Sequence, residues 1–95
     1  MIERQVHFDV HPERSSDFEE FFKNEYRPAM ARSAGFISVD LLVNPGEPGH
    51  YQMAIRFTDQ LSSDAWRASD DHKRLAPRLK EMYSSSQVML YEVTV

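Results

Sequence analysis

Two kinds of hydrophobic periodicity alternate along this chain, and their order most strongly constrains its fold. Apolar residues recur at every second position in residues 2–10, 36–43, 51–57 and 87–95, which is typical of strands with one apolar face. The segments after the first and third of these show helical spacing instead. The order β-α-β-β-α-β predicts an α+β, ferredoxin-like fold, in which both helices cover one face of a four-stranded antiparallel sheet.

The first helical segment has recognisable start and stop signals. Ser16 and Glu19 have the spacing of a capping box, and aromatic residues follow at helical spacing. Pro28 is expected to kink this helix, because proline lacks an amide donor and clashes with the preceding turn. Gly35 is expected to end it.

The second helical segment spans about residues 62–83, and its expected apolar face runs from Ala65 through His72 and Leu75 to Tyr83. Ser69 and Asp70 are both good N-cap residues, so a helix break is predicted there that would turn Trp66 inward. The serine run at 84–86 is expected to be a short loop, and 44–49 a turn-rich connection between the two middle strands.

The strand periodicities also assign side chains to faces. Arg4 interrupts the apolar phase of the first strand and is expected near an edge. The apolar face of the second strand is expected to contain Ile37, Val39, Leu41 and Val43.

Composition narrows the class of protein. A net charge of −4 with no basic stripe argues against nucleic-acid binding, and the absence of cysteine excludes disulfides and thiolate metal sites. No apolar run approaches the roughly 20 residues of a membrane span, and the N-terminus has no signal-peptide pattern. We therefore expect one soluble, cytoplasmic domain over residues 1–95. A domain this short has a small core of its own, which makes dimerisation a reasonable expectation.

Trp66 and His72 are the first candidates for chemistry. If both line a cleft between helix and sheet, the indole could stack on a planar substrate and the imidazole could move a proton. The structural alternatives are that Trp66 fills the core and that His72 is an ordinary helix residue with a satisfied hydrogen bond. The sequence leaves both possibilities open.

Glu25 and His7 are the reserve candidates for proton transfer. Glu25 lies within an aromatic stripe, where a carboxylate has either a partner or a raised pKa, unless the kink at Pro28 turns it to solvent. His7 lies on the polar side of its strand and could simply face water. Apolar neighbours expected to complete a substrate-binding wall with Trp66 are Phe22, Tyr26 and Leu75.

No metal site or cofactor motif is evident. The four histidines show no i,i+4 pairing and no HExxH pattern. The chain also lacks a glycine-rich phosphate loop and a Gly-x-Ser-x-Gly elbow. We expect neither a metal nor a bound cofactor.

Ordered motifs along the whole chain resemble the antibiotic biosynthesis monooxygenase (ABM) family. They are a first strand ending at Val10-His11-Pro12, a helix leading through Arg27-Pro28-Ala29-Met30 to Ala34-Gly35-Phe36, and the stretch from Trp66 to Leu75. The resemblance implies a homodimer whose two sheets close into an α+β barrel, with a pocket between sheet and helices in each monomer.

The resemblance implies several activities. One is cofactor-independent monooxygenation of a small phenol- or quinol-like molecule, with Trp66 packing the substrate and His72 as base. The alternative is a non-catalytic ligand-binding or stress-related dimer. Haem degradation is less expected. In that branch a histidine on the helix and an asparagine on the first strand accompany the tryptophan. In this chain the helix position corresponds to about Ala76, and the first strand has His7 but no asparagine.

Overall fold

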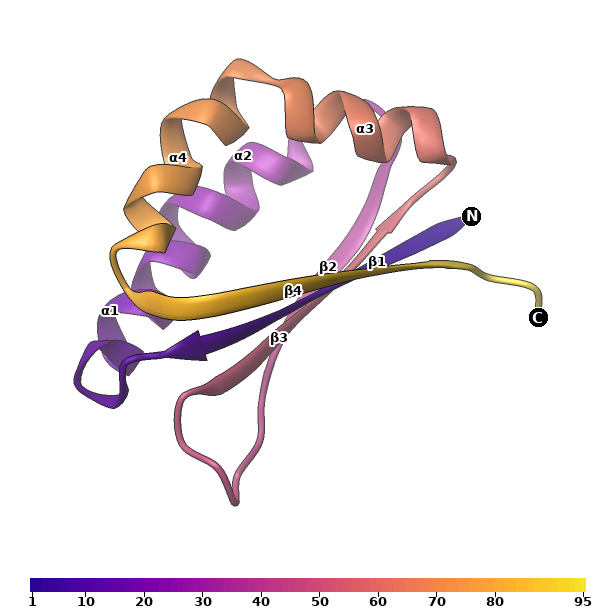
Figure 1. Ribbon diagram of the computed structural model, residues 1–95. Coiled ribbons are helices and arrows are strands. Elements are labelled where there is room, and N and C mark those ends of the chain that lie inside the picture. The colour runs from indigo at the N-terminus through magenta and orange to yellow at the C-terminus, as the bar shows by residue number, and fades with distance from the viewer.

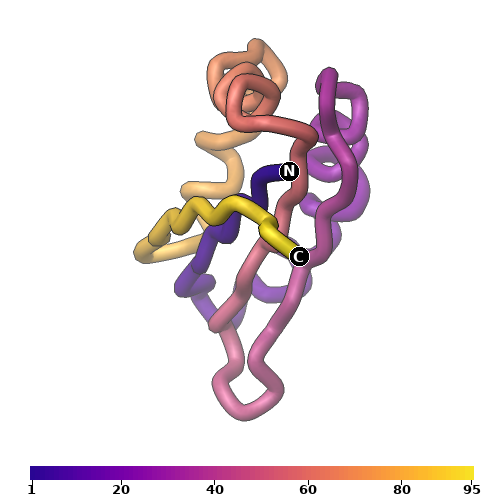
Figure 2. Tube along the Cα trace, turned by 90° about the vertical axis from the view of Figure 1, so that its right-hand side faces the viewer, coloured from indigo at the N-terminus to yellow at the C-terminus, as the bar shows by residue number.

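The protein forms a twisted sheet with all its helices on one side, as a computed structural model of residues 1–95 describes (Figures 1 and 2). The strands are β1 (Ile2–Val10), β2 (Phe36–Val43), β3 (His50–Phe57) and β4 (Tyr83–Glu92). They pair in the order β2-β3-β1-β4, and every pairing is antiparallel. The ferredoxin-like α+β prediction is therefore confirmed.

The helical layer consists of two broken helices. The first comprises the 3-10 turn η1 (Pro12–Arg14), α1 (Ser15–Phe21), the π-helical turn η2 (Phe22–Tyr26) and α2 (Arg27–Ala31). The second comprises α3 (Gln60–Ala68) and α4 (Asp70–Lys80). No helix is long and apolar enough to cross a membrane.

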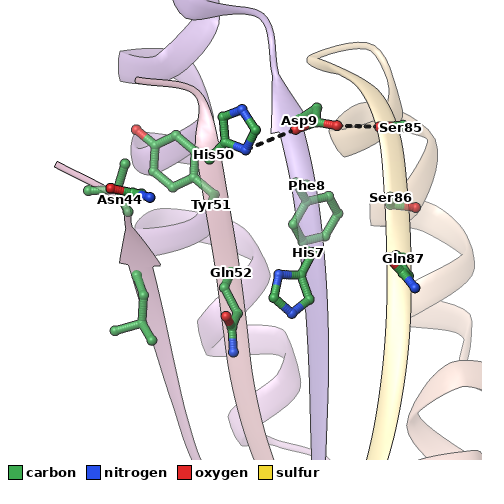
Figure 3. Close-up of a pocket in the computed structure, with 12 residues that line it drawn as sticks. His7, Phe8, Asp9, Asn44, His50, Tyr51, Gln52, Ser85, Ser86 and Gln87 are labelled. Atoms are coloured by element: carbon green, nitrogen blue, oxygen red, sulfur yellow. Dashed lines mark hydrogen bonds and ion pairs between the residues drawn. The ribbon is translucent and has the colours of Figure 1, made fainter. Parts of the chain in front are cut away.

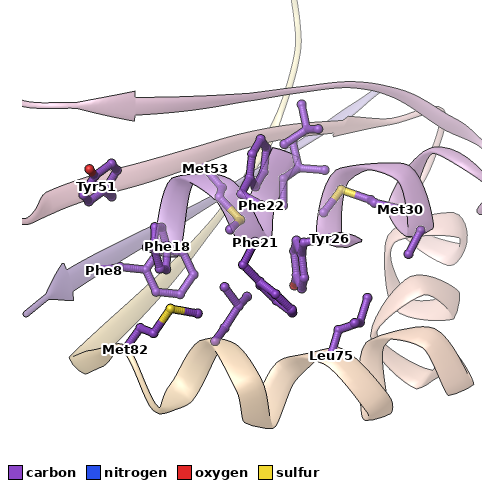
Figure 4. Close-up of a cluster of buried hydrophobic side chains, with 14 of the residues drawn as sticks. Phe8, Phe18, Phe21, Phe22, Tyr26, Met30, Tyr51, Met53, Leu75 and Met82 are labelled. Carbon is purple, nitrogen blue, oxygen red and sulfur yellow. The ribbon is translucent and has the colours of Figure 1, made fainter. Parts of the chain in front are cut away.

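The hydrophobic core lies between these helices and the sheet (Figure 4). Phe18 from α1, Met53 from β3 and Leu75 from α4 are fully buried there. Phe8 of β1 packs edge-on against Phe18, with ring centroids 5.4 Å apart. Side chains from the helices and from the sheet thus share one core.

One detail of the first helix differs from the prediction. The capping box is wrong: Pro12 starts η1, α1 begins at Ser15, and no side chain caps it, so Ser16 lies inside the first turn. The kink predicted at Pro28 falls next to an irregularity, because the π turn η2 precedes α2 and the amide of Arg27 donates to the carbonyl of Phe22. A π turn is a known site of helix distortion.

The predicted break in the second helix is confirmed. Ser69 separates α3 from α4, accepting from the amide of His72 at 3.1 Å and donating to the carbonyl of Trp66 at 2.6 Å. Trp66 is turned inward and is only 2% exposed. The same break leaves Ala65 exposed, so its predicted place on the apolar face is wrong.

Two strand assignments also need correction. The serine run is not a loop, because β4 begins at Tyr83 and Ser86 pairs with Phe8 of β1. In β2, a bulge between Phe36 and Ser38 changes the phase of the alternation, so that Ile37 is exposed. Val43 at the other end is exposed too, whereas Val39 is buried as predicted.

Candidate functional site

A cavity of about 210 Å³ lies between the helices and the sheet. Nine of its thirteen lining residues are hydrophobic, including Trp66, Tyr26 and Ile55. The polar members are Arg4, Arg67, His72 and Ser86. An apolar pocket with a few convergent polar groups is the usual form of a small-molecule site.

Three aromatic side chains form one wall of this pocket. The ring of Trp66 packs edge to face against Tyr26, with centroids 5.6 Å apart, and against His72, with centroids 5.4 Å apart. Edge-to-face pairs of this kind add stability beyond the area they bury. Trp66 therefore fills the core and lines the pocket at once, and it holds the imidazole of His72 in place.

Burial changes the protonation behaviour of this wall. The pKa of His72 is lowered, chiefly because its half-buried imidazole is desolvated and secondarily because Arg4 and Arg67 add positive charge nearby. His72 is therefore neutral at pH 7, as a proton acceptor must be. Burial raises the pKa of Tyr26 to about 12, so its hydroxyl stays protonated and can donate a hydrogen bond.

Arg4 lies on the inner face of the sheet rather than near an edge. Its strand is central, and Arg4 sits between Ile55 of β3 and Leu90 of β4. The residue is only 9% exposed. Burial, followed by the charge of Arg67, lowers the pKa of its guanidinium.

The structure brings only three of the seven candidate residues together in this pocket: Trp66, Tyr26 and His72. Phe22 and Leu75 are buried in the core but do not line the cavity. Glu25 points away from it and pairs with Arg78 of α4 at 2.9 Å on the surface. Of the alternatives left open for this carboxylate, the structure shows an ion-pair partner at the surface, and Glu25 does not line the pocket.

His7 lies on the opposite face of the sheet, in an open hollow of about 700 Å³ (Figure 3). There Asp9 accepts from Ser85 at 2.6 Å and lies 3.3 Å from His50 Nδ1. The side chains of Asp9 and His50 are about half exposed, so water weakens their electrostatic influence. We therefore regard the smaller pocket, whose lining is more apolar, as the better candidate site, although the hollow is larger.

Arg4 and Arg67 line the pocket but are not among the site residues predicted from the sequence. A usable signal existed for Arg4, since it is a charged residue in the apolar phase of a strand. Arg67 gave no such signal, because an arginine beside a helical tryptophan is unremarkable. No group of three or more His, Asp or Glu side chains is placed to hold a metal ion.

Similar folds occur among solved structures. A conserved protein from Methanosarcina mazei Go1 is 21% identical with a TM-score of 0.87, over 98% of this chain and 92% of that one. SnoaB, a cofactor-independent oxygenase from Streptomyces nogalater, is 22% identical with a TM-score of 0.87, over 99% and 93% of the two chains. At these identities the likeness establishes the fold.

Sequence comparison establishes the family. No curated protein sequence matches the chain. The family model described as "Antibiotic biosynthesis monooxygenase" matches residues 1–78, which is most of the chain and includes Trp66 and His72. The protein therefore belongs to the antibiotic biosynthesis monooxygenase family.

Proposed function

We propose that the protein is a cofactor-independent monooxygenase that oxidises a small phenol- or quinol-like molecule in the pocket between sheet and helices. The observation that carries the proposal is the neutral, half-buried imidazole of His72 held against Trp66 at an apolar cavity. Family membership and the fold shared with an oxygenase such as SnoaB support it.

The roles of the residues follow from their positions. The aromatic wall at Trp66 binds the substrate ring, and His72 takes the phenolic proton, which makes the ring a better electron donor. Tyr26 remains protonated and donates to the substrate oxygen. A substrate bound in the pocket would displace water from it, which strengthens each of these interactions.

The reaction balances with O₂ as the only co-substrate. A phenol ring carbon loses its C–H bond and gains a C=O bond, giving a quinone. One atom of O₂ enters the product and the other leaves as water, together with the ring hydrogen and the hydroxyl hydrogen. The substrate supplies all the electrons, so this chemistry needs no flavin or metal from the protein.

Oxygen uptake with a panel of single-ring phenols and quinols tests the proposal. His72→Gln keeps a hydrogen-bonding group but cannot titrate near neutral pH, so turnover should fall about 10²- to 10⁴-fold with little change in binding. His11→Gln is the matched control, because His11 precedes η1 and lies outside the pocket. Wild-type turnover by His72→Gln would exclude His72 as the base. If compounds of the panel bind but none of them supports oxygen uptake, the non-catalytic alternative is favoured.

We also infer that the protein is a homodimer that pairs its uncovered sheet faces. The helices cover only one face (Figure 1). The other face carries large, exposed apolar side chains, among them Leu42, Met89 and Tyr91, at 49%, 39% and 44% exposure. Exposed apolar surface of this kind marks interaction sites.

Sedimentation at micromolar concentration tests this inference and should give twice the monomer mass. Met89→Glu should yield monomers, because it places a charge within the paired faces. Leu61→Glu is the control, since Leu61 is 79% exposed on α3. A wild-type protein that stays monomeric would rule out the barrel arrangement.

A further inference from the structure

Arg4 is a buried cation without a partner. Its residue is more than nine-tenths buried and lines the cavity, yet every ion pair and side-chain hydrogen bond in the protein involves other residues. Taking a guanidinium out of water is costly unless an anion or acceptor compensates it. No side chain of the protein hydrogen-bonds or ion-pairs with the guanidinium of Arg4, whose nitrogens keep some contact with solvent at the cavity, since Ser63 Oγ is the one fully buried side-chain polar atom without a partner.

The surroundings of Arg4 reinforce this imbalance. The polar lining of the cavity consists of Arg4, Arg67, His72 and Ser86, and it includes no acidic residue. Tyr26 and then Asp64 act on the pKa of Arg4 in the opposite direction, each with a smaller effect than Arg67. The pocket is therefore positively charged although the whole chain has a net charge of −4, so its charge is a local feature of the fold.

We propose that Arg4 and Arg67 form a carboxylate-binding subsite, and that the molecule bound in this pocket is a small aromatic acid rather than a neutral quinol. The inference rests on the proposed function in placing the ring against Trp66. It adds the identity of the polar group that fixes the orientation of that ring.

Geometry and size both fit this ligand class. A guanidinium presents a planar fork of donors that matches a carboxylate in two parallel hydrogen bonds. A cavity of about 210 Å³ equals roughly seven water volumes of about 30 Å³ each, which favours a single ring with a short substituent over a fused polycyclic molecule. The ring would contact the apolar lining, and its carboxylate would neutralise the guanidinium.

Binding of benzoate and benzamide tests the proposal, because the two have nearly the same shape and differ in charge. Trp66 is the only tryptophan and lines the pocket, so its fluorescence reports occupancy. Benzoate should bind at least about tenfold more tightly than benzamide, as expected for hydrogen bonds to a charged group. Arg4→Gln should abolish this preference. The matched control Arg14→Gln should retain it, because Arg14 pairs with Asp17 on the surface.

Two further measurements keep the test decisive. If Arg4→Gln fails to fold, Arg67→Gln replaces it, because Arg67 is an exposed residue whose removal spares the core. The C–H resonances of His72 provide the second readout, since benzoate should raise the pKa of His72 by bringing a negative charge beside it and benzamide should not.

Equal affinities for the two compounds, no detectable binding of benzoate, or an unchanged preference in the arginine variants would overturn the proposal. This outcome is distinct from failure of the proposed function. Oxygen uptake with neutral quinols would leave the monooxygenase proposal standing without the carboxylate subsite. Selective benzoate binding without oxygen uptake for any phenol, including hydroxybenzoates, would leave the subsite standing without the oxygenase.

Discussion

Trp66→Ala is the substitution that best tests how the aromatic wall connects stability and binding. Trp66 is 2% exposed and packs against both Tyr26 and His72. Truncating a buried tryptophan typically costs about 3–5 kcal/mol of unfolding free energy. One side of this indole already borders a cavity, so it has fewer packing partners than a fully enclosed ring. We therefore expect a loss near the lower limit, about 3 kcal/mol.

Urea denaturation followed by circular dichroism measures this loss, because the variant has no tryptophan fluorescence. With a slope of about 2 kcal/mol per molar urea, the midpoint should fall by roughly 1.5 M. Protein concentration must be the same for both proteins, since dimerisation would contribute to the apparent stability. Leu61→Ala on the same helix is the control and should change stability by no more than about 0.5 kcal/mol.

The variant should also lose affinity for ring compounds, because its larger cavity no longer has an aromatic wall. A stability loss below about 1 kcal/mol would refute the view that Trp66 belongs to the core. A loss of about 3 kcal/mol with ligand affinity intact would show instead that Trp66 only fills space. Trp66→Phe should recover part of both properties, since it restores a ring facing Tyr26 and His72.

Two more predictions concern the backbone and pH. Gly35→Ala should cost more than about 1 kcal/mol of unfolding free energy in a melting experiment. The backbone φ at Gly35 is +80°, and the new methyl group would collide with the Ser62 side chain and lie 2.8 Å from Thr58 Oγ1. Gly46→Ala is the control and should be tolerated, because the nearest neighbour of its methyl group would be 3.5 Å away. Because the pKa of His72 is lowered in the folded protein, the unfolded state takes up the proton first as pH falls below about 6.5. The free energy of unfolding should therefore decline from that pH down through the folded-state pKa of His72. Denaturation curves at about pH 7.5 and 5 measure this decline, and His72→Gln should make it smaller.

Local sequence signals predicted the elements of this fold well. The strict alternation of β3 placed Tyr51, Met53, Ile55 and Phe57 in the core, where they are buried. The cap at Ser69 correctly predicted the helix break that turns Trp66 inward. These features depend on residues close together in the chain, so their physics is readable from a short window.

The predictions from sequence differed from the structure where a local irregularity in a strand or helix changed which side chains after it face the core. The bulge in β2 exposed Ile37, and the π turn lies in the segment that places Glu25 beside Arg78, at the surface position that the sequence had left open as an alternative. Neither the bulge nor the π turn has a distinctive residue pattern. Both are settled by how the element packs on its neighbours, which lies beyond a window of sequence.

The sequence by itself determined the order of strands and helices, the family, and the choice of Trp66 and His72 as candidates. Only the tertiary structure decided which candidates share a pocket. It separated His7 and Glu25 from His72, and it placed Arg4 beside Arg67 because β1 is a central strand under the second broken helix. Periodicity fixes the face on which a side chain lies, whereas its neighbours depend on contacts between segments far apart in the chain.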